Sequence, residues 1–350
     1  MDAFVQNQIN QLQEYCQKTA PKVIVWTLVY NHEPYLRDYF EGIIKQQTNF
    51  NFIAAVHDDL STDNSAEIIK EYAEKYPDII KPIYEKENQY SKHDGSLENL
   101  LNMTLKASGA EYLAVCEGDD YWTDPLKLKK QVDFMESNPE YTLCYTELNF
   151  YEQSTKQTIK NVFASHYINR YQTYQDFLIY KGYIAPCSWL LKKGYFKAET
   201  GNPIDTTYDV ALYNYCNGKV GYLPDNTCTY RILEQSASHL SSMKAIYNRS
   251  RGLYKTQLHY INHYAELLSP NIVYQIKANA LKGLLLSAWY FNDTDIKTEI
   301  QSFYSNSIKF RIIMAVFDIP FFKSLIPLYR AVRVKIMPRG LAAHMAKAKQ

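Results

Sequence analysis

The chain has 350 residues, enough for one large domain or two modest ones with a sizeable core. Its 38 Lys and Arg nearly balance its 37 Asp and Glu, so net charge gives no argument for nucleic acid as a partner. Six scattered cysteines without a C-x-x-C spacing argue against a zinc ribbon or a secreted disulfide scaffold and favour reduced cytosolic thiols. The first residues lack the features of a signal peptide, and no apolar run approaches the ~18 residues of a membrane span.

Residues 1–122 alternate between patterns typical of helices and of strands. Apolar residues at helical spacing predict a leading helix over residues 1–20, which Pro21 ends. Runs of β-branched and other apolar residues predict four strands, at 23–29, 52–56, 79–84 and 111–116. Amphipathic segments predict helices at 33–47, from the loop after residue 60 to about residue 76, and at 97–107. This alternation is typical of a mostly parallel, Rossmann-like sheet with helices on both faces.

The pattern becomes less regular after Trp122. A helix is expected from Asp124 to about Ser137, and residues 150–185 give no clear pattern. Further strands are expected at 141–151, 187–191 and 221–231. Residues 243–304 predict helices alone, so a helical region follows the sheet.

Three carboxylates lie within four residues directly after the predicted strand 111–116, at Glu117, Asp119 and Asp120. Gly118 between them permits a sharp turn where a Cβ atom would clash. Open α/β sheets bind ligands at the carboxyl ends of their strands. Clustered carboxylates repel one another unless a cation compensates, and Mg²⁺ takes one or two carboxylates together with phosphate oxygens. A solvated acidic turn is the alternative, but the apolar strand before the cluster and Trp122 after it favour a nucleotide–metal site.

Three motifs, in order and at matching spacing, resemble glycosyltransferase family 2 over residues 21–240. Residues 27–36 (TLVYNHEPYL) resemble the opening strand and turn, with Thr27 where the family often has proline. Residues 57–65 (HDDLSTDNS) are similar to the family's D-D-G-S-T-D-N-S loop, with Leu60 in place of glycine. Residues 117–122 (EGDDYW) resemble the D-x-D element of bacterial transferases that build surface polysaccharides. The resemblance implies an α/β protein of GT-A fold, with a mostly parallel central sheet flanked by helices and a helical C-terminal region.

The resemblance also implies a donor site and a metal. Asp59 would accept the imide N–H of uracil, and Asp120 would bind Mn²⁺ or Mg²⁺. Arg231, in a Tyr-Arg pair after the last core strand, would neutralise diphosphate charge. An Asx-type turn that caps the next helix is the alternative for Asp58 and Asp59. The implied donor-binding residues are Thr27, Tyr30, Glu33, Asp59, Asn88, Asp119 and Arg231.

Sugar transfer to a hydroxyl needs a general base behind the acceptor. Asp209 is similar to the family's acidic residue at the start of the helix beneath the acceptor site. An ordinary helix N-cap is the alternative for this residue, and Asp205 competes with it for the role of base.

The last 42 residues, 309–350, carry nine Lys or Arg against one acid, Asp318. Apolar residues lie between the cations, and Pro320 and Pro327 break the segment into short amphipathic pieces. Cationic faces beside Phe, Ile and Leu predict attachment in the plane of an anionic membrane surface. A helical cap packed on the domain, or a homodimer contact, is the alternative.

We therefore expect five segments: a leading helix at 1–20, the nucleotide-binding half at 21–122, the acceptor-binding half at 123–240, a helical region at 241–308 and the tail at 309–350. The predicted function is an inverting, metal-dependent hexosyl- or N-acetylhexosaminyltransferase. It would move a sugar from a UDP-sugar to a glycan or polyprenyl-linked glycan in surface-polysaccharide synthesis, at the cytoplasmic face of the membrane.

Two other function classes stay open. A sugar-1-phosphate nucleotidyltransferase would need a glycine-rich phosphate loop after the first strand, which residues 27–31 lack. A non-catalytic nucleotide-sugar-binding or membrane scaffold protein is the second class, against which the four acids Asp59, Asp119, Asp120 and Asp209 argue together. A homo-oligomer also stays open.

Overall fold

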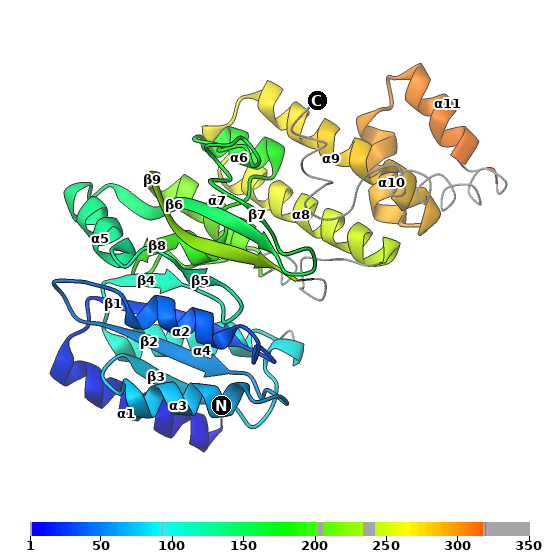
Figure 1. Ribbon diagram of the computed structural model, residues 1–350. Coiled ribbons are helices and arrows are strands. Elements are labelled where there is room, and N and C mark those ends of the chain that lie inside the picture. The colour runs from blue at the N-terminus through cyan, green and yellow to red at the C-terminus, as the bar shows by residue number, and fades with distance from the viewer. Residues whose placement is uncertain (1, 93, 202–205, 234–241, 318, 320–350) are drawn as a thin grey trace. The chain divides into compact units, whose positions relative to one another are not determined.

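The structure is a computed structural model that describes residues 2–92, 94–201, 206–233, 242–317 and 319 (Figure 1). The chain divides into two compact units. The first unit consists of Met1–Gln172 and Tyr183–Glu234, and the second of Thr173–Gly182 and Gln235–Gln350.

Four parallel strands in the order β3-β2-β1-β4 form the first half of the sheet in the first unit. They are β1 (Val23–Val29), β2 (Phe52–Asp58), β3 (Ile80–Tyr84) and β4 (Tyr112–Val115). The helices of this half are α1 (Ala3–Thr19), α2 (Leu36–Ile44), α3 (Ser65–Lys75) and α4 (Ser96–Ser108), with α1 packed on α4 and α2 on α3. The chain builds outward from β1 to β3 and then crosses to the other side of β1, which creates a topological switch point between β1 and β4.

The predicted strands of this half are confirmed, and their burial explains why they were predictable. Every residue of β2 and β4, and all but one of β1, is buried, as in parallel sheets covered on both faces. β2 extends two residues beyond the expected end, to Asp58. α2 begins at Leu36 rather than at residue 33, and residues 33–35 form a turn in which Tyr35 N donates to the His32 carbonyl at 2.9 Å.

The same sheet continues through β8, β6, β9 and β5, with β7 paired to β6. β8 is antiparallel to both β4 and β6, whereas β6 and β9 are parallel. β8 begins at Trp189 instead of residue 187 because Pro186–Ser188 form a 3₁₀ turn, η2. The elements are β5 (Tyr121–Trp122), α5 (Lys127–Ser137), β6 (Tyr141–Glu152), β7 (Gln157–Ile159), β8 (Trp189–Lys192), α7 (Thr206–Asn217) and β9 (Lys219–Ile232).

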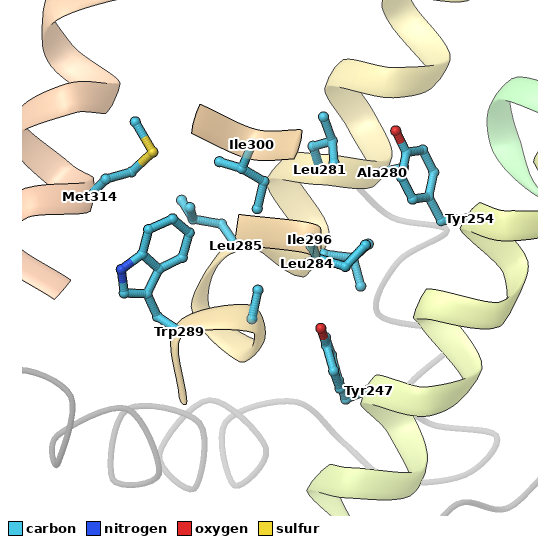
Figure 2. Close-up of a cluster of buried hydrophobic side chains, with 11 residues drawn as sticks. Tyr247, Tyr254, Ala280, Leu281, Leu284, Leu285, Trp289, Ile296, Ile300 and Met314 are labelled. Carbon is cyan, nitrogen blue, oxygen red and sulfur yellow. The ribbon is translucent and has the colours of Figure 1, made fainter. Parts of the chain in front are cut away.

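The described part of the second unit is helical, which confirms the prediction for residues 243–304. Its elements are α6 (Tyr174–Tyr180), α8 (Met243–His263), η3 (Ala265–Leu267), α9 (Pro270–Tyr290), α10 (Thr294–Phe303) and α11 (Ile308–Phe317). Figure 2 shows its apolar core, in which Tyr247 and Tyr254 of α8 face α9 and α10. Their hydroxyls donate to Asp293 at 2.8 Å and to Glu299 at 2.5 Å, so both rings are buried with their polar ends satisfied.

The helix α6 comes from the stretch whose sequence gave no clear pattern, and it belongs to the second unit. Gln257 of α8 donates to the Leu178 carbonyl at 2.6 Å, and Tyr174 donates to the Tyr260 carbonyl at 3.2 Å. The seven residues of α6 are too few for a helical period to stand out in the sequence.

Only the beginning of the predicted basic tail can be described. The helix α11, which begins one residue before it, exposes Ile308 and Ile312 by 74% and 59% beside Lys309 and Arg311, and buries Met314 in the apolar core of the second unit. Residues 320–350 lie outside the described residues. No helix in the described part of the chain is long and apolar enough to cross a membrane.

Candidate functional site

Residues Glu117–Asp120, here called the carboxylate turn, follow β4 and are tied to β1 by their backbone. Cys116 N donates to the Trp26 carbonyl and Gly118 N to the Leu28 carbonyl, each at 3.1 Å. A Cβ atom on Gly118 would lie 2.9 Å from both His32 Nδ1 and Val29 Cγ2. Glycine is therefore required here by close packing, which holds the turn at the switch point of the sheet.

The carboxylate turn holds more negative charge than its protein surroundings neutralise. Asp120 is 2% exposed, and burial, followed by the charges of Asp119 and Glu117, raises its pKa well above the ordinary value. Glu117 reaches solvent, but the surrounding protein and the charge of Asp119 raise its pKa to about 7. Asp119 Oδ1 is buried without a hydrogen-bond partner. A group that brings positive charge to this turn would relieve all three effects.

A divalent cation shared with a phosphate group fits these residues. Among the residues that the structure describes, no three His, Cys, Asp or Glu side chains are grouped to hold a metal by themselves. Mg²⁺, however, is commonly bound through one or two carboxylates, with phosphate oxygens and water completing its ligands. Asp120, with Asp119 beside it, supplies the hard oxygen donors that such a site needs.

The loop after β2 presents a second acid, which the protein itself satisfies. Asp59 is fully buried, and its two carboxylate oxygens accept hydrogen bonds from Gln89 N at 2.6 Å and Tyr90 N at 2.9 Å. Asn88 Nδ2 donates to the Asp59 carbonyl at 2.9 Å. The structure thus joins Asp59 and Asn88, two predicted donor-binding residues, in one arrangement that fixes the loop after β3.

Leu60 adopts the left-handed conformation, with a φ of 62°. It stands where the resembling family has glycine, the residue that adopts this conformation without steric cost. The leucine side chain is 42% exposed, so this backbone conformation is adopted by a residue that is not packed in the core. The same loop leaves Asp58 Oδ1 buried without a partner, while Oδ2 accepts from Ser61 N at 3.3 Å.

The predicted residues of the first strand and turn have different surroundings. Thr27 is buried in β1, and its hydroxyl hydrogen-bonds with that of Tyr39. Tyr30 follows β1, the strand between β2 and β4, and its side chain is 45% exposed. The Glu33 carboxylate accepts from Asn64 N at 3.1 Å and Asn64 Nδ2 at 2.7 Å, so it holds the loop before α3.

Arg231 lies on β9 next to the carboxylate turn. Its backbone N–H donates to Asp120 Oδ1 and its Nε to the Asp119 carbonyl, both at 2.8 Å. The other two guanidinium nitrogens donate to Gln153 and Asp38. Asp38 and Gln153 were missed in the sequence, where no motif marks them.

Asp209 is fully buried in the first turn of α7. Its Oδ1 accepts from Glu199 N at 3.1 Å, and its Oδ2 accepts from Thr200 N at 2.9 Å and Thr200 Oγ1 at 2.5 Å. The carboxylate therefore anchors the preceding loop, and its role as a base stays a prediction. The competing Asp205 lies outside the described residues.

The family model described as "Glycosyl transferase family 2" matches residues 24–197. "Uncharacterized protein Rv1520" of Mycobacterium tuberculosis is 41% identical over 133 residues, which cover 38% of this chain and 37% of that protein. "Putative glycosyltransferase EpsE" of Bacillus subtilis is 34% identical over 135 residues, 39% of this chain and 46% of that protein. "Minor teichoic acid biosynthesis protein GgaB" of Bacillus subtilis is 27% identical over 261 residues, 73% of this chain and 26% of that protein. The chain thus spans less than half the length of each of these relatives.

Two solved structures are similar over most of the chain. TarS 1-349 of S. aureus in complex with UDP-GlcNAc has a TM-score of 0.51 at 16% identity and covers 89% of this chain and 92% of its own. The mannosyltransferase PcManGT of Pyrobaculum calidifontis, in complex with GDP-Man and Mn²⁺, has a TM-score of 0.50 at 13% identity, with 99% and 94% covered. At these identities the likeness shows the fold, and the predicted fold class is confirmed.

Proposed function

Residues 24–197 form a glycosyl transferase family 2 domain of GT-A fold, and from this premise we propose that the protein is an inverting, metal-dependent glycosyltransferase. The observation that carries the proposal is the carboxylate turn. Its unbalanced acids lie at the switch point of a mostly parallel sheet, where α/β proteins bind their ligands.

The donor in this proposal is a nucleotide-diphosphate sugar, with UDP as its nucleotide. The base would lie near Asp59 and the exposed Tyr30, and the diphosphate near Asp119 and Asp120. A divalent cation on Asp120 would stabilise the charge of the departing diphosphate. The UDP-GlcNAc complex of TarS supports UDP as the nucleotide. Because PcManGT was solved with GDP-Man, a GDP-sugar is the alternative donor to test.

Asp209 is the proposed general base, which removes the acceptor proton as the acceptor oxygen attacks C1 of the sugar. Its position in the first turn of α7, where the resemblance to the family places the acid beneath the acceptor, supports this role. An acceptor hydroxyl would have to replace Thr200 at Asp209 Oδ2.

A glycan or polyprenyl-linked glycan of a cell-surface polysaccharide is the proposed acceptor. The name of the relative GgaB, a teichoic acid biosynthesis protein, supports this class of acceptor. The exposed Ile308 and Ile312 beside Lys309 and Arg311 support attachment to an anionic membrane surface, with the enzyme at the cytoplasmic face.

Nucleotide release from the full chain tests the activity. UDP- and GDP-sugars are supplied with Mn²⁺ or Mg²⁺, with and without an acceptor extract. Metal-dependent release that the extract accelerates is expected. Pyrophosphate formation from UTP and a sugar-1-phosphate would favour a nucleotidyltransferase, and donor binding without turnover would favour a non-catalytic binding protein.

Sedimentation with vesicles tests the membrane proposal separately. The full chain should pellet with vesicles that contain anionic lipid, and high salt should release part of it. A chain that ends at Ser307 should stay in the supernatant. Equal partitioning of the two chains would favour a packed or dimerising tail.

A further inference from the structure

Arg231 is only 5% exposed, and all of its side-chain nitrogens donate to protein oxygens. Nε donates to the Asp119 carbonyl, Nη1 to Gln153 Oε1 and Nη2 to Asp38 Oδ2, each at 2.8 Å. These acceptors belong to the carboxylate turn, to the residue after β6 and to α2. One side chain therefore joins three parts of the first unit that are far apart in the sequence.

Three tyrosine rings surround the same guanidinium. Its Cζ lies 4.9 Å from the ring centroid of Tyr35, 5.1 Å from that of Tyr121 and 5.5 Å from that of Tyr151. Cations within about 6 Å of an aromatic ring are attracted by its electron-rich face, most strongly where water is excluded. A planar guanidinium can stack on rings while it donates in three directions, whereas a lysine ammonium is a compact point charge.

The connection to the carboxylate turn is double, because the main chain of Arg231 also takes part. Its backbone N–H donates to Asp120 Oδ1 at 2.8 Å, while Nε holds the carbonyl of the neighbouring Asp119. The guanidinium makes its ion pair with the exposed carboxylate of Asp38, at 2.8 Å. The side chain thus fixes the turn through a carbonyl and leaves the carboxylate charges of Asp119 and Asp120 for another cation.

We infer that Arg231 is a positioning residue that orients Asp119 and Asp120 for a metal-bound diphosphate and does not itself bind the diphosphate. This inference rests on the proposed function. It differs from the role implied by the sequence resemblance, in which the arginine neutralises phosphate charge directly.

Arg231→Lys in the full chain tests the inference. Loss of the residues that orient metal ligands commonly costs 10–100-fold in metal affinity or activity. We expect Mn²⁺ affinity in the presence of UDP, followed by the EPR signal of free Mn²⁺, to fall by about tenfold or more. Turnover should fall in parallel, while the donor KM at saturating Mn²⁺ changes little. Tyr151→Leu removes one ring but none of the three hydrogen-bond acceptors of the guanidinium, and it should shift the Mn²⁺ requirement in the same direction by less.

Arg37→Lys is the matched control, because Arg37 makes a two-pronged ion pair with Glu71 and lies 5.9 Å from the Tyr72 ring on the surface of the same unit. It should leave the Mn²⁺ requirement unchanged.

If Arg231 instead bound the diphosphate directly, Arg231→Lys would leave the Mn²⁺ requirement unchanged, because lysine also binds phosphate. Overturning results are a rise in donor KM with an unchanged Mn²⁺ requirement in Arg231→Lys, or full activity of this variant. A wild-type chain that releases no nucleotide with any donor would remove the proposed function, and the inference with it.

Discussion

Two loops at the same edge of one sheet, after β2 and β4 on either side of β1, carry buried acids with different surroundings. Asp59 after β2 receives a backbone N–H on each carboxylate oxygen. Asp120 after β4 receives one N–H, and its burial, followed by the charges of Asp119 and Glu117, raises its pKa. The comparison indicates that a protein can use a buried aspartate either to fix a loop or to form a site whose negative charge favours the binding of a cation. Hydrogen-bond donors and nearby charges decide between the two.

Asp120→Asn should have the largest effect, because it removes the ionised ligand while its Oδ1 can still accept from Arg231. Turnover should be abolished. The melting temperature of the metal-free protein should not fall, since a carboxyl whose pKa folding raises destabilises the folded state at neutral pH. Nucleotide release and thermal unfolding, each with Mn²⁺ or EDTA, measure both effects.

The control for this variant is Asp133→Asn, at an exposed acid that pairs with Lys129 on α5. Full activity of Asp120→Asn in EDTA would contradict the metal role. A large drop in its metal-free melting temperature would contradict the comparison with Asp59.

Asp209→Asn should lower turnover by about 10²-fold or more, with donor binding largely kept, as for a lost general base. Single-turnover kinetics and UDP binding separate the two quantities. Thr200→Val removes one hydrogen-bond donor to the Asp209 carboxylate, so it measures how far turnover depends on the anchoring of the loop. Equal losses in the two variants would indicate anchoring, and an active Asp209→Asn beside an inactive Asp205→Asn would transfer the role to Asp205.

Asp59→Asn should destabilise the protein where Asp120→Asn does not. An amide nitrogen would face the N–H of Gln89 or Tyr90, and a buried group left without its partner costs about 1–3 kcal/mol. Urea unfolding measures this loss, and the donor KM should rise as the loop after β3 loosens. A stability equal to that of Asp133→Asn would show that the two N–H groups do not depend on the Asp59 charge.

Leu60→Gly should have the smallest effect, a gain of up to about 1 kcal/mol in the free energy of unfolding, because glycine adopts positive φ without strain. Leu126→Gly is the matched control, at a leucine of similar exposure with a φ of −100°. The control should lose stability. A loss of the same size in both variants would indicate that side-chain contacts of Leu60 outweigh its backbone strain.

The sequence predicted the features that depend on residues adjacent in the chain. β1 and β2 were predictable because apolar runs of strand length leave few other structures, and the charge of the carboxylate turn because its acids lie within four residues. The contacts of Arg231 were not predictable. Its partners Asp38 and Gln153 lie 193 and 78 residues away, so only the completed sheet brings them together. The anchoring of Asp209 to Glu199 and Thr200 likewise depends on a loop that no motif marks.

The strand β9 limits how this part of the sheet can change in length during evolution. Cys228 pairs with Trp122 of β5, and Arg231, three residues later, pairs with Tyr151 of β6. Inserting or deleting one residue between them would turn the arginine to the opposite face of the sheet. Residues 154–156, after Gln153 in the turn between β6 and β7, carry no such restriction, so related chains should differ in length there while the spacing from Cys228 to Arg231 stays constant.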